Sequence, residues 1–66
     1  MATAREIGEA IKAARTAAGI TQAELAKRLD VTPQTISQYE RGIKNPKFET
    51  LKKIADGLKI SWMDLY

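Results

Sequence analysis

Apolar residues recur along the first half of this chain at the spacing of an α-helix, and the runs are separated by clear stop signals. Thr3 and Glu6 form a capping box at the start of the first run, and Gly19 ends it in a left-handed conformation. A second capping box, Thr21 with Glu24, opens a helix that extends to about Leu29. We expect these two helices to bury Ile7, Ala10, Ile11, Ala14, Ala18, Leu25, Ala26 and Leu29.

Three further helices are predicted in the second half. Thr32 caps a short helix that begins at Pro33 and is ended by Gly42, and an extended loop around Pro46 follows it. The next helix extends from about Phe48 to Leu58, and Ser61 caps a last short helix. Their inward residues are expected to be Ile36, Tyr39, Phe48, Leu51, Ile54, Ala55, Leu58, Trp62 and Leu65. No stretch alternates like a strand, so the sequence predicts one all-α domain, residues 1–66, with five helices.

The junction between the second and third helices is the most informative part of the pattern. Only three residues, 30–32, separate Leu29 from Pro33, and a connection this short makes the two helices cross at a steep angle. Ala26 is small where they must meet, and Ile36 points back into the joint. These features predict a helix-turn-helix at about residues 22–41, whose second helix projects its outer face.

That outer face is polar in an unusual way. It carries Gln34, Ser37, Gln38 and Arg41, whereas an exposed helix face that only meets water usually carries Glu and Lys. Amides and guanidinium groups are the side chains that hydrogen-bond base edges and phosphates. The face therefore favours nucleic acid as a partner over an apolar protein groove, which would require apolar anchors at helical spacing.

Charge is distributed unevenly along the chain. The first 40 residues carry equal numbers of basic and acidic side chains, so the net charge of +3 arises after them. Residues 41–53 contain Arg41, Lys44, Lys47, Lys52 and Lys53 against Glu49 alone. A polyanion would suit this basic segment. Charge alone does not distinguish a segment that binds a polyanion from a lysine-rich surface that only meets water.

Composition argues against several other functions. The chain has no cysteine and no histidine, so thiolate ligands, the commonest metal ligand and the commonest general base are all missing. We therefore expect no metal, no cofactor and no enzyme, because a 66-residue bundle also leaves little room for a substrate pocket. No apolar run approaches the ~20 residues that span a bilayer, and we expect a cytoplasmic protein without a membrane partner.

The sequence resembles a known family in one long segment. "ITQAELAKRLDVTPQTISQYERG", followed by an asparagine-proline loop and "LKKIADGLKIS", is similar to the lambdoid phage repressor class, also called the Xre-type or Cro-repressor-like helix-turn-helix family. The resemblance covers about residues 7–65. It implies a five-helix repressor fold and sequence-specific binding to operator DNA. It also implies a two-fold dimer on a palindromic site.

The resemblance also assigns roles to individual residues. Base-reading positions match Gln34, Thr35 and Gln38, with Thr32 near the groove edge. Phosphate-binding positions match Gln22, Arg41, Lys44 and Asn45, and the helix geometry adds Ser37 at the groove wall. Glu40 matches a carboxylate that pairs with an arginine of the first helix, here Arg15. The sequence departs from the family pattern at Asp30, which replaces the turn glycine. It also departs at Pro33, which occupies a position that often reads a base.

Protein binding remains an alternative to DNA binding. Some members of this fold act as antitoxins or coactivators that bind proteins, and a further C-terminal domain or partner protein outside this chain would also fit. The C-terminal residues Met63 and Tyr66 cannot both point inward with Trp62 and Leu65, so they are candidate contacts of a weak homodimer. A frayed terminus would explain their exposure equally well.

Overall fold

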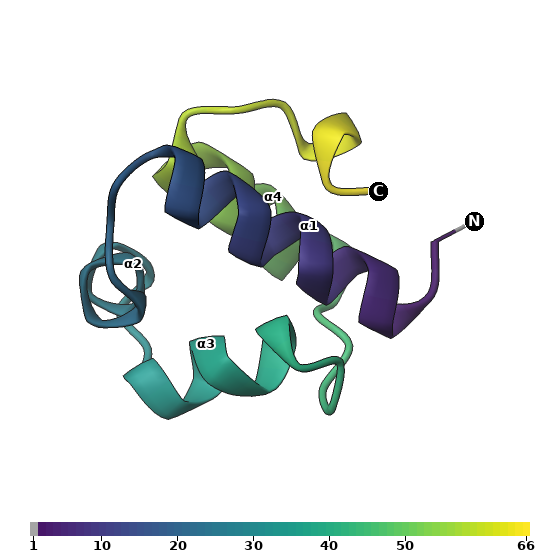
Figure 1. Cartoon of the computed structure of the whole chain (residues 1–66), viewed down its shortest axis with the longest axis horizontal. Helices are drawn as coiled ribbons and strands as arrows, with labels where there is room; N and C mark the ends of the chain where they lie inside the picture. The colour runs from purple at the N-terminus through teal and green to yellow at the C-terminus, as the bar shows by residue number, and fades with distance from the viewer. Residues whose placement is uncertain (1) are drawn as a thin grey trace.

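Four α-helices and one 3₁₀ turn make up the secondary structure of residues 2–66, the part of the chain that this computed structural model describes (Figure 1). The helices are α1 (Ala4–Ala17), α2 (Gln22–Leu29), α3 (Pro33–Glu40) and α4 (Phe48–Leu58), and the turn is η1 (Trp62–Asp64). No strand occurs within these residues, which confirms the all-α prediction. The predicted fifth helix is wrong, because its segment closes only i→i+3 hydrogen bonds, Asp64 N to Ser61 O and Leu65 N to Trp62 O.

Local capping signals fix where the helices begin and end. Both predicted capping boxes are present, Thr3 with Glu6 and Thr21 with Glu24, and Ser61 forms a third with Asp64. Gly19 ends the first helical segment with a φ of 73°, as predicted. Asp30 takes the left-handed conformation that the turn requires, with a φ of 57°. Lys47 provides no side-chain cap for α4.

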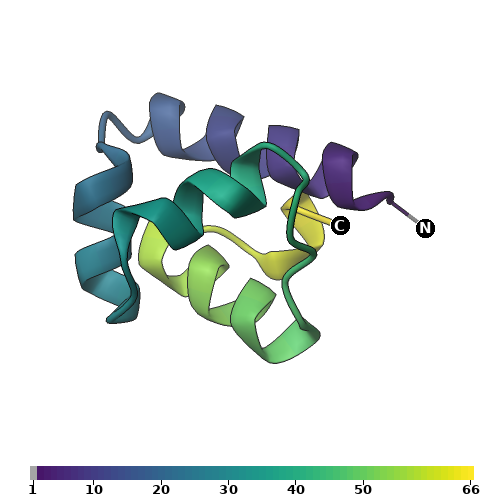
Figure 2. The ribbon, with the colours of Figure 1, turned by 90° about the horizontal axis from the view of Figure 1, so that it is seen from below.

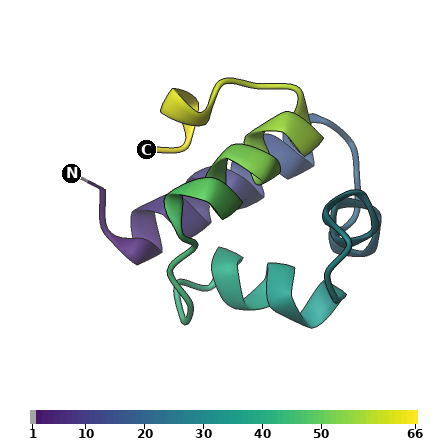
Figure 3. The same ribbon diagram turned by 180° about the vertical axis from the view of Figure 1, so that it is seen from behind.

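The helices surround a single core. α1 and α4 lie alongside each other, and α3 lies beneath both of them (Figures 1 and 3). α2 is seen nearly end-on in both views, whereas α3 lies across the picture, so the two helices cross steeply as the short connection predicts. Seen from below, α3 lies in front of the other helices (Figure 2). Its outer side is therefore a free face of the molecule.

Most of the predicted inward residues form the core. It contains Ile7, Ile11, Leu25, Ala26, Ile36, Tyr39, Leu51, Ile54, Ala55, Leu58 and Leu65. Two predictions are wrong, because Ala18 follows the last turn of α1 and is exposed, and Phe48 is 52% exposed. The Phe48 ring packs edge-on against Trp62, with ring centroids 5.0 Å apart, on the outside of the core. Within residues 2–66 none of the helices is long and apolar enough to cross a membrane.

Candidate functional site

The outer face of α3 is formed by the polar residues that the sequence pattern placed there. Gln34 and Arg41 are exposed, and Ser37 and Gln38 are half-buried at the edges of the helix. The opposite side of α3 is buried and carries Ile36, Tyr39 and Glu40. The helix therefore presents amide, hydroxyl and guanidinium groups to solvent while its apolar side holds it on the core.

Two threonines meet at the leading end of α3. Thr32 is the N-cap residue, and its Oγ1 accepts a hydrogen bond from the Thr35 backbone N–H at 3.2 Å. The two hydroxyl oxygens also lie 2.9 Å apart and share a hydrogen bond. Pro33 occupies the first helical position, as predicted. The predicted base-reading threonines are thus brought together, with their hydroxyls bonded to each other.

The loop that follows α3 carries the basic residues. The Gln38 carbonyl accepts hydrogen bonds from the backbone N–H groups of Ile43 and Lys44, at 3.0 and 3.3 Å, so the loop folds back on the helix end. Lys44 and Asn45 are exposed, and the Lys44 ammonium lies 6.0 Å from the centroid of the Tyr39 ring. The Arg41 Nε donates to the Ser37 carbonyl at 3.4 Å. Cationic groups therefore border the end of the outer face.

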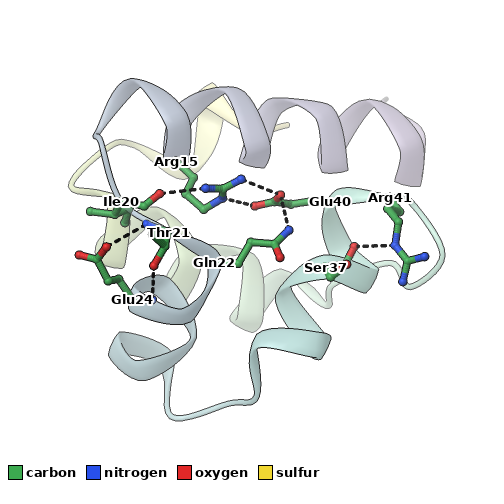
Figure 4. Close-up of polar contacts among 8 residues, drawn as sticks. All are labelled: Arg15, Ile20, Thr21, Gln22, Glu24, Ser37, Glu40 and Arg41. Atoms are coloured by element: carbon green, nitrogen blue, oxygen red, sulfur yellow. Dashed lines mark hydrogen bonds and ion pairs between the residues drawn. The ribbon is translucent and has the colours of Figure 1, made fainter.

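A buried ion pair joins α3 to α1 (Figure 4). Arg15 of α1 approaches the Glu40 carboxylate with two guanidinium nitrogens, Nε at 2.6 Å and Nη2 at 3.2 Å. Its third nitrogen, Nη1, donates to the Ile20 carbonyl at 2.8 Å. The hydrogen bond to Glu40 raises the pKa of Arg15, and burial opposes this rise. This is the pair that the resemblance implied.

Gln22 adds the third side chain to this cluster. Its Nε2 donates to Glu40 Oε1 at 3.0 Å, so the first residue of α2 is tied to the last residue of α3. An amide nitrogen carries two hydrogens, which leaves one N–H and the amide oxygen for another partner. Among the described residues, no buried side-chain nitrogen or oxygen lacks a hydrogen-bond partner. Arg15, Glu40 and Gln22 therefore form a satisfied network that fixes α3 against α1 and α2.

Two contacts between helices involve residues that were not identified from the sequence. Gly8 lies where α1 crosses the end of α3, and a Cβ added there would lie 2.3 Å from the Tyr39 carbonyl oxygen. Arg28 donates from Nη1 to the Gly57 carbonyl at 2.7 Å and so joins α2 to α4. For the contact between Gly8 and α3, the only signal in the sequence is a glycine within a helical pattern. Nothing in the sequence pairs Arg28 with Gly57.

The sequence is similar to those of known proteins over most of the chain. A helix-turn-helix family matches residues 11–65 of the chain. The human Endothelial differentiation-related factor 1 is 39% identical over 62 residues, which cover 91% of this chain and 42% of that protein. The HTH-type transcriptional regulator ImmR of Bacillus subtilis is 36% identical over 55 residues, which cover 83% of this chain and 43% of that regulator. The chain thus spans less than half the length of these two relatives.

A solved structure matches the fold over almost the whole chain. It is the restriction-modification controller protein C.AhdI from Aeromonas hydrophila, with a TM-score of 0.90 and 27% identity. The match covers 96% of each chain. The arrangement of α1–α4 is therefore that of a solved regulatory protein of similar size.

Proposed function

The chain belongs to the helix-turn-helix family, and on that premise we propose that it is a transcriptional regulator that binds DNA through α3. α3 would enter the major groove with its outer face toward the base edges. We propose further that the protein is a repressor that recognises a specific operator. The controller protein and the regulator ImmR support this proposal, because their names describe regulatory roles.

The proposal rests on one observation, the difference between the two faces of α3. The outer face of α3 carries Gln34, Gln38 and Arg41, which are exposed or half-exposed, and it lies next to the basic loop. The ion pair between Arg15 and Glu40 holds the opposite face of α3 against the core. A helix that is held rigidly and presents amide and cationic groups is suited to read bases, since direct readout depends on fixed hydrogen-bond geometry.

We assign base reading chiefly to Gln34. It lies in the first turn of α3, and this end enters the groove most deeply in the motif. Its amide is able to donate to and accept from N6 and N7 of one adenine. Gln38, one turn further on, would reach a neighbouring base pair. Thr35 and Thr32 would lie beside them at the leading end of the helix.

The remaining polar residues are proposed to bind phosphates and so to set the orientation on the duplex. They are Gln22 through its free amide groups, Ser37, Arg41, Lys44 and Asn45. Residues 22–41 would then act as the reading unit of one domain. Because the proposed partner is DNA, we also propose the cytoplasmic location expected from the sequence.

The test is binding to duplex DNA over a range of salt concentrations. A site selected from a random library and a scrambled duplex are compared by measuring their dissociation constants between about 50 and 200 mM salt, where phosphate contacts lose much of their affinity. Each neutralised phosphate contributes about −0.9 to the slope of log K against log salt. We expect a steep slope on both duplexes and tighter binding to the selected one.

Single variants separate the two classes of residue. Gln34→Ala should cost about 1–3 kcal/mol on the selected site and little on the scrambled duplex. Lys44→Ala and Arg41→Ala should weaken both duplexes alike and reduce the salt slope by about one each. Lys12→Ala, on α1, is the matched control and should change neither. Absence of salt-dependent binding would contradict the proposal and favour a protein-binding module of the antitoxin or coactivator type.

A further inference from the structure

The two ends of α3 are held in different ways. Its last residue, Glu40, accepts hydrogen bonds from Arg15 of α1 and Gln22 of α2, so polar side chains fix the trailing end. Its first residue, Pro33, has no backbone N–H and follows a turn of three residues, 30–32. The position of the leading end therefore depends largely on what holds the C-terminal end of α2.

The turn continues the end of α2 as one unit. The Val31 backbone N–H donates to the Ala26 carbonyl at 3.0 Å, and the Asp30 N–H donates to the Lys27 carbonyl at 3.3 Å. Asp30 takes the left-handed conformation, which closes a helix end and sets the direction of the chain that leaves it. A change in the direction of α2 would thus be passed on to the start of α3.

A hydrogen bond ties the end of α2 to α4. Arg28 Nη1 donates to the Gly57 carbonyl at 2.7 Å. That carbonyl is one of the last four of α4, which have no N–H partner within the helix, so Arg28 caps it. Leu25 and Leu29 also meet Gly57, since a Cβ added there would lie 3.3 and 3.0 Å from their Cδ1 atoms. Apolar packing is non-directional, whereas a hydrogen bond has a preferred geometry, so Arg28 restricts the angle between α2 and α4.

Side-chain packing does not brace the turn beside this hydrogen bond. An open hollow of about 450 Å³ lies there between α2 and α4. It is lined by Arg28, Leu29, Asp30, Lys53, Asp56 and Gly57. The hydrogen bond of Arg28 therefore bridges the two helices at the edge of an unfilled space.

We propose that Arg28 is a positioning residue for DNA binding. Through its hydrogen bond to Gly57 it holds the leading end of α3, and with it Gln34, in the orientation that reads bases. This inference rests on the proposed function. Arg28 acts through the turn and does not itself contact DNA. Arg15 and Glu40 hold the trailing end separately, so the phosphate contacts of the basic loop should not depend on Arg28.

The test uses a variant that removes the donor and keeps the helix. Arg28→Met loses the guanidinium group and retains a long side chain that favours helix. Lys27→Met is the matched control, because Lys27 is exposed on the same helix and the substitution removes the same charge. The wild-type protein and both variants are compared on the selected and the scrambled duplex, well below their melting temperatures. A residue that only stabilises the fold would leave the ratio of the two affinities unchanged under these conditions.

Arg28→Met should bind the selected duplex about fivefold more weakly, the loss that corresponds to one hydrogen bond. Binding to the scrambled duplex should stay within about twofold of the wild-type value, with an unchanged salt slope, because no phosphate contact is lost. In the background of Gln34→Ala the same substitution should have an effect below about twofold, since the residue it positions is missing. In the background of Lys44→Ala it should keep its full effect of about fivefold.

Amide hydrogen exchange of the free protein tests the positioning without DNA. The N–H groups of Asp30 and Val31 close the end of α2, and that of Ala18 bonds to Ala14 at the end of α1. In Arg28→Met the first two should exchange about fivefold faster, because the end of α2 opens more often once one hydrogen bond is lost. The Ala18 N–H should exchange at the wild-type rate, and Lys27→Met should leave all three unchanged.

Four outcomes would each overturn the proposal. They are an unchanged ratio of affinities in Arg28→Met, an equal loss in Lys27→Met, a full effect that persists beside Gln34→Ala, and unchanged exchange at Asp30 and Val31. A wild-type protein that bound no duplex would remove the proposed function. Faster exchange at these two amides would then leave Arg28 as a structural contact only.

Discussion

Single residues decide how closely α3 lies against α1. Gly8 is the point of closest approach, because a Cβ at this position would lie 2.3 Å from the Tyr39 carbonyl oxygen and 2.7 Å from that of Glu40. Both atoms belong to the backbone and cannot rotate away. The glycine costs α1 some helical stability, and it allows the end of α3 to approach.

Gly8→Ala should therefore destabilise the domain by about 3 kcal/mol, at the upper end of what overpacking usually costs. Gly57→Ala is the matched control, since its Cβ would lie 3.0 Å from Leu29 Cδ1, the mobile end of a side chain. There the gain in helix propensity, about 1 kcal/mol, should offset the crowding. Urea unfolding measures both variants. Similar free energies of unfolding for the two would show that α1 and α3 are further apart than described.

Glu40 is the second residue on which the position of α3 depends. Its residue surface is only 6% exposed, and its carboxylate is held by Arg15 and Gln22. Removing one partner of a buried ion pair leaves an unpaired charge in a poorly solvated place.

Arg15→Ala should accordingly cost about 3–5 kcal/mol, reduced somewhat because Gln22 remains bound to Glu40. Lys12→Ala, also on α1 and exposed, should change stability by less than about 0.5 kcal/mol. The double variant Arg15→Met/Glu40→Leu should be more stable than Arg15→Ala, because it removes both charges. Thermal and urea unfolding measure the stability of each variant. Equal small losses of stability for Arg15→Ala and Lys12→Ala would refute the role of the ion pair.

At the scale of the elements, the helix boundaries could be predicted because their signals are local. Capping boxes, Gly19 and Pro33 act within four residues of a helix end, so the sequence alone places them. Contacts between elements were harder to predict. Neither the hydrogen bond from Arg28 to Gly57 nor the exposure of Phe48 follows from periodicity, because each depends on how helices cross. In the site, the outer residues of α3 could be predicted, whereas the pairing of Thr32 with Thr35 required the structure.

The capping box of α2 gives this helix a pH dependence. The hydrogen bond that the Glu24 carboxylate accepts from the Thr21 backbone N–H lowers the pKa of Glu24 from its ordinary value of 4.5, and the Thr21 side chain lowers it further. A carboxylate whose pKa is lower in the folded state stabilises the fold fully above about pH 4.5, and this contribution is lost as the pH falls through the folded value.

Glu24→Gln keeps an oxygen that accepts from Thr21 and removes the titration. The variant should be slightly less stable than the wild-type protein at pH 7, and the difference should disappear below the folded pKa. Melting temperatures of both proteins from pH 7 to pH 2 test this expectation. A difference that stays constant over the whole range would mean that the charge of Glu24 does not support the cap.

At the scale of the whole molecule, two surfaces lie on different sides of the core. The outer face of α3 is on one side of α1 and α4, and η1 lies on the other (Figures 1 and 3). Around η1 two large apolar side chains are exposed, Met63 at 67% and Tyr66 at 45%. The Tyr66 ring packs edge-on against Trp62, with centroids 6.1 Å apart, so Trp62, Met63 and Tyr66 give this side of the molecule an apolar surface.

We propose that this apolar surface joins two copies of the chain on a palindromic site, whose half-sites would lie about 34 Å apart, one turn of DNA. The surface is small, so self-association should be weak without DNA and strengthened by it. Sedimentation with a palindromic duplex should then give two proteins per duplex at saturation, bound cooperatively. The substitution Met63→Gln adds no charge. It should weaken pairing about tenfold, because one apolar side chain would no longer be buried between the two copies. Ala13→Gln on the exposed side of α1 is the control and should leave pairing unchanged. A single protein per duplex at saturation would contradict the proposed dimer. The chain would then bind a single half-site as a monomer.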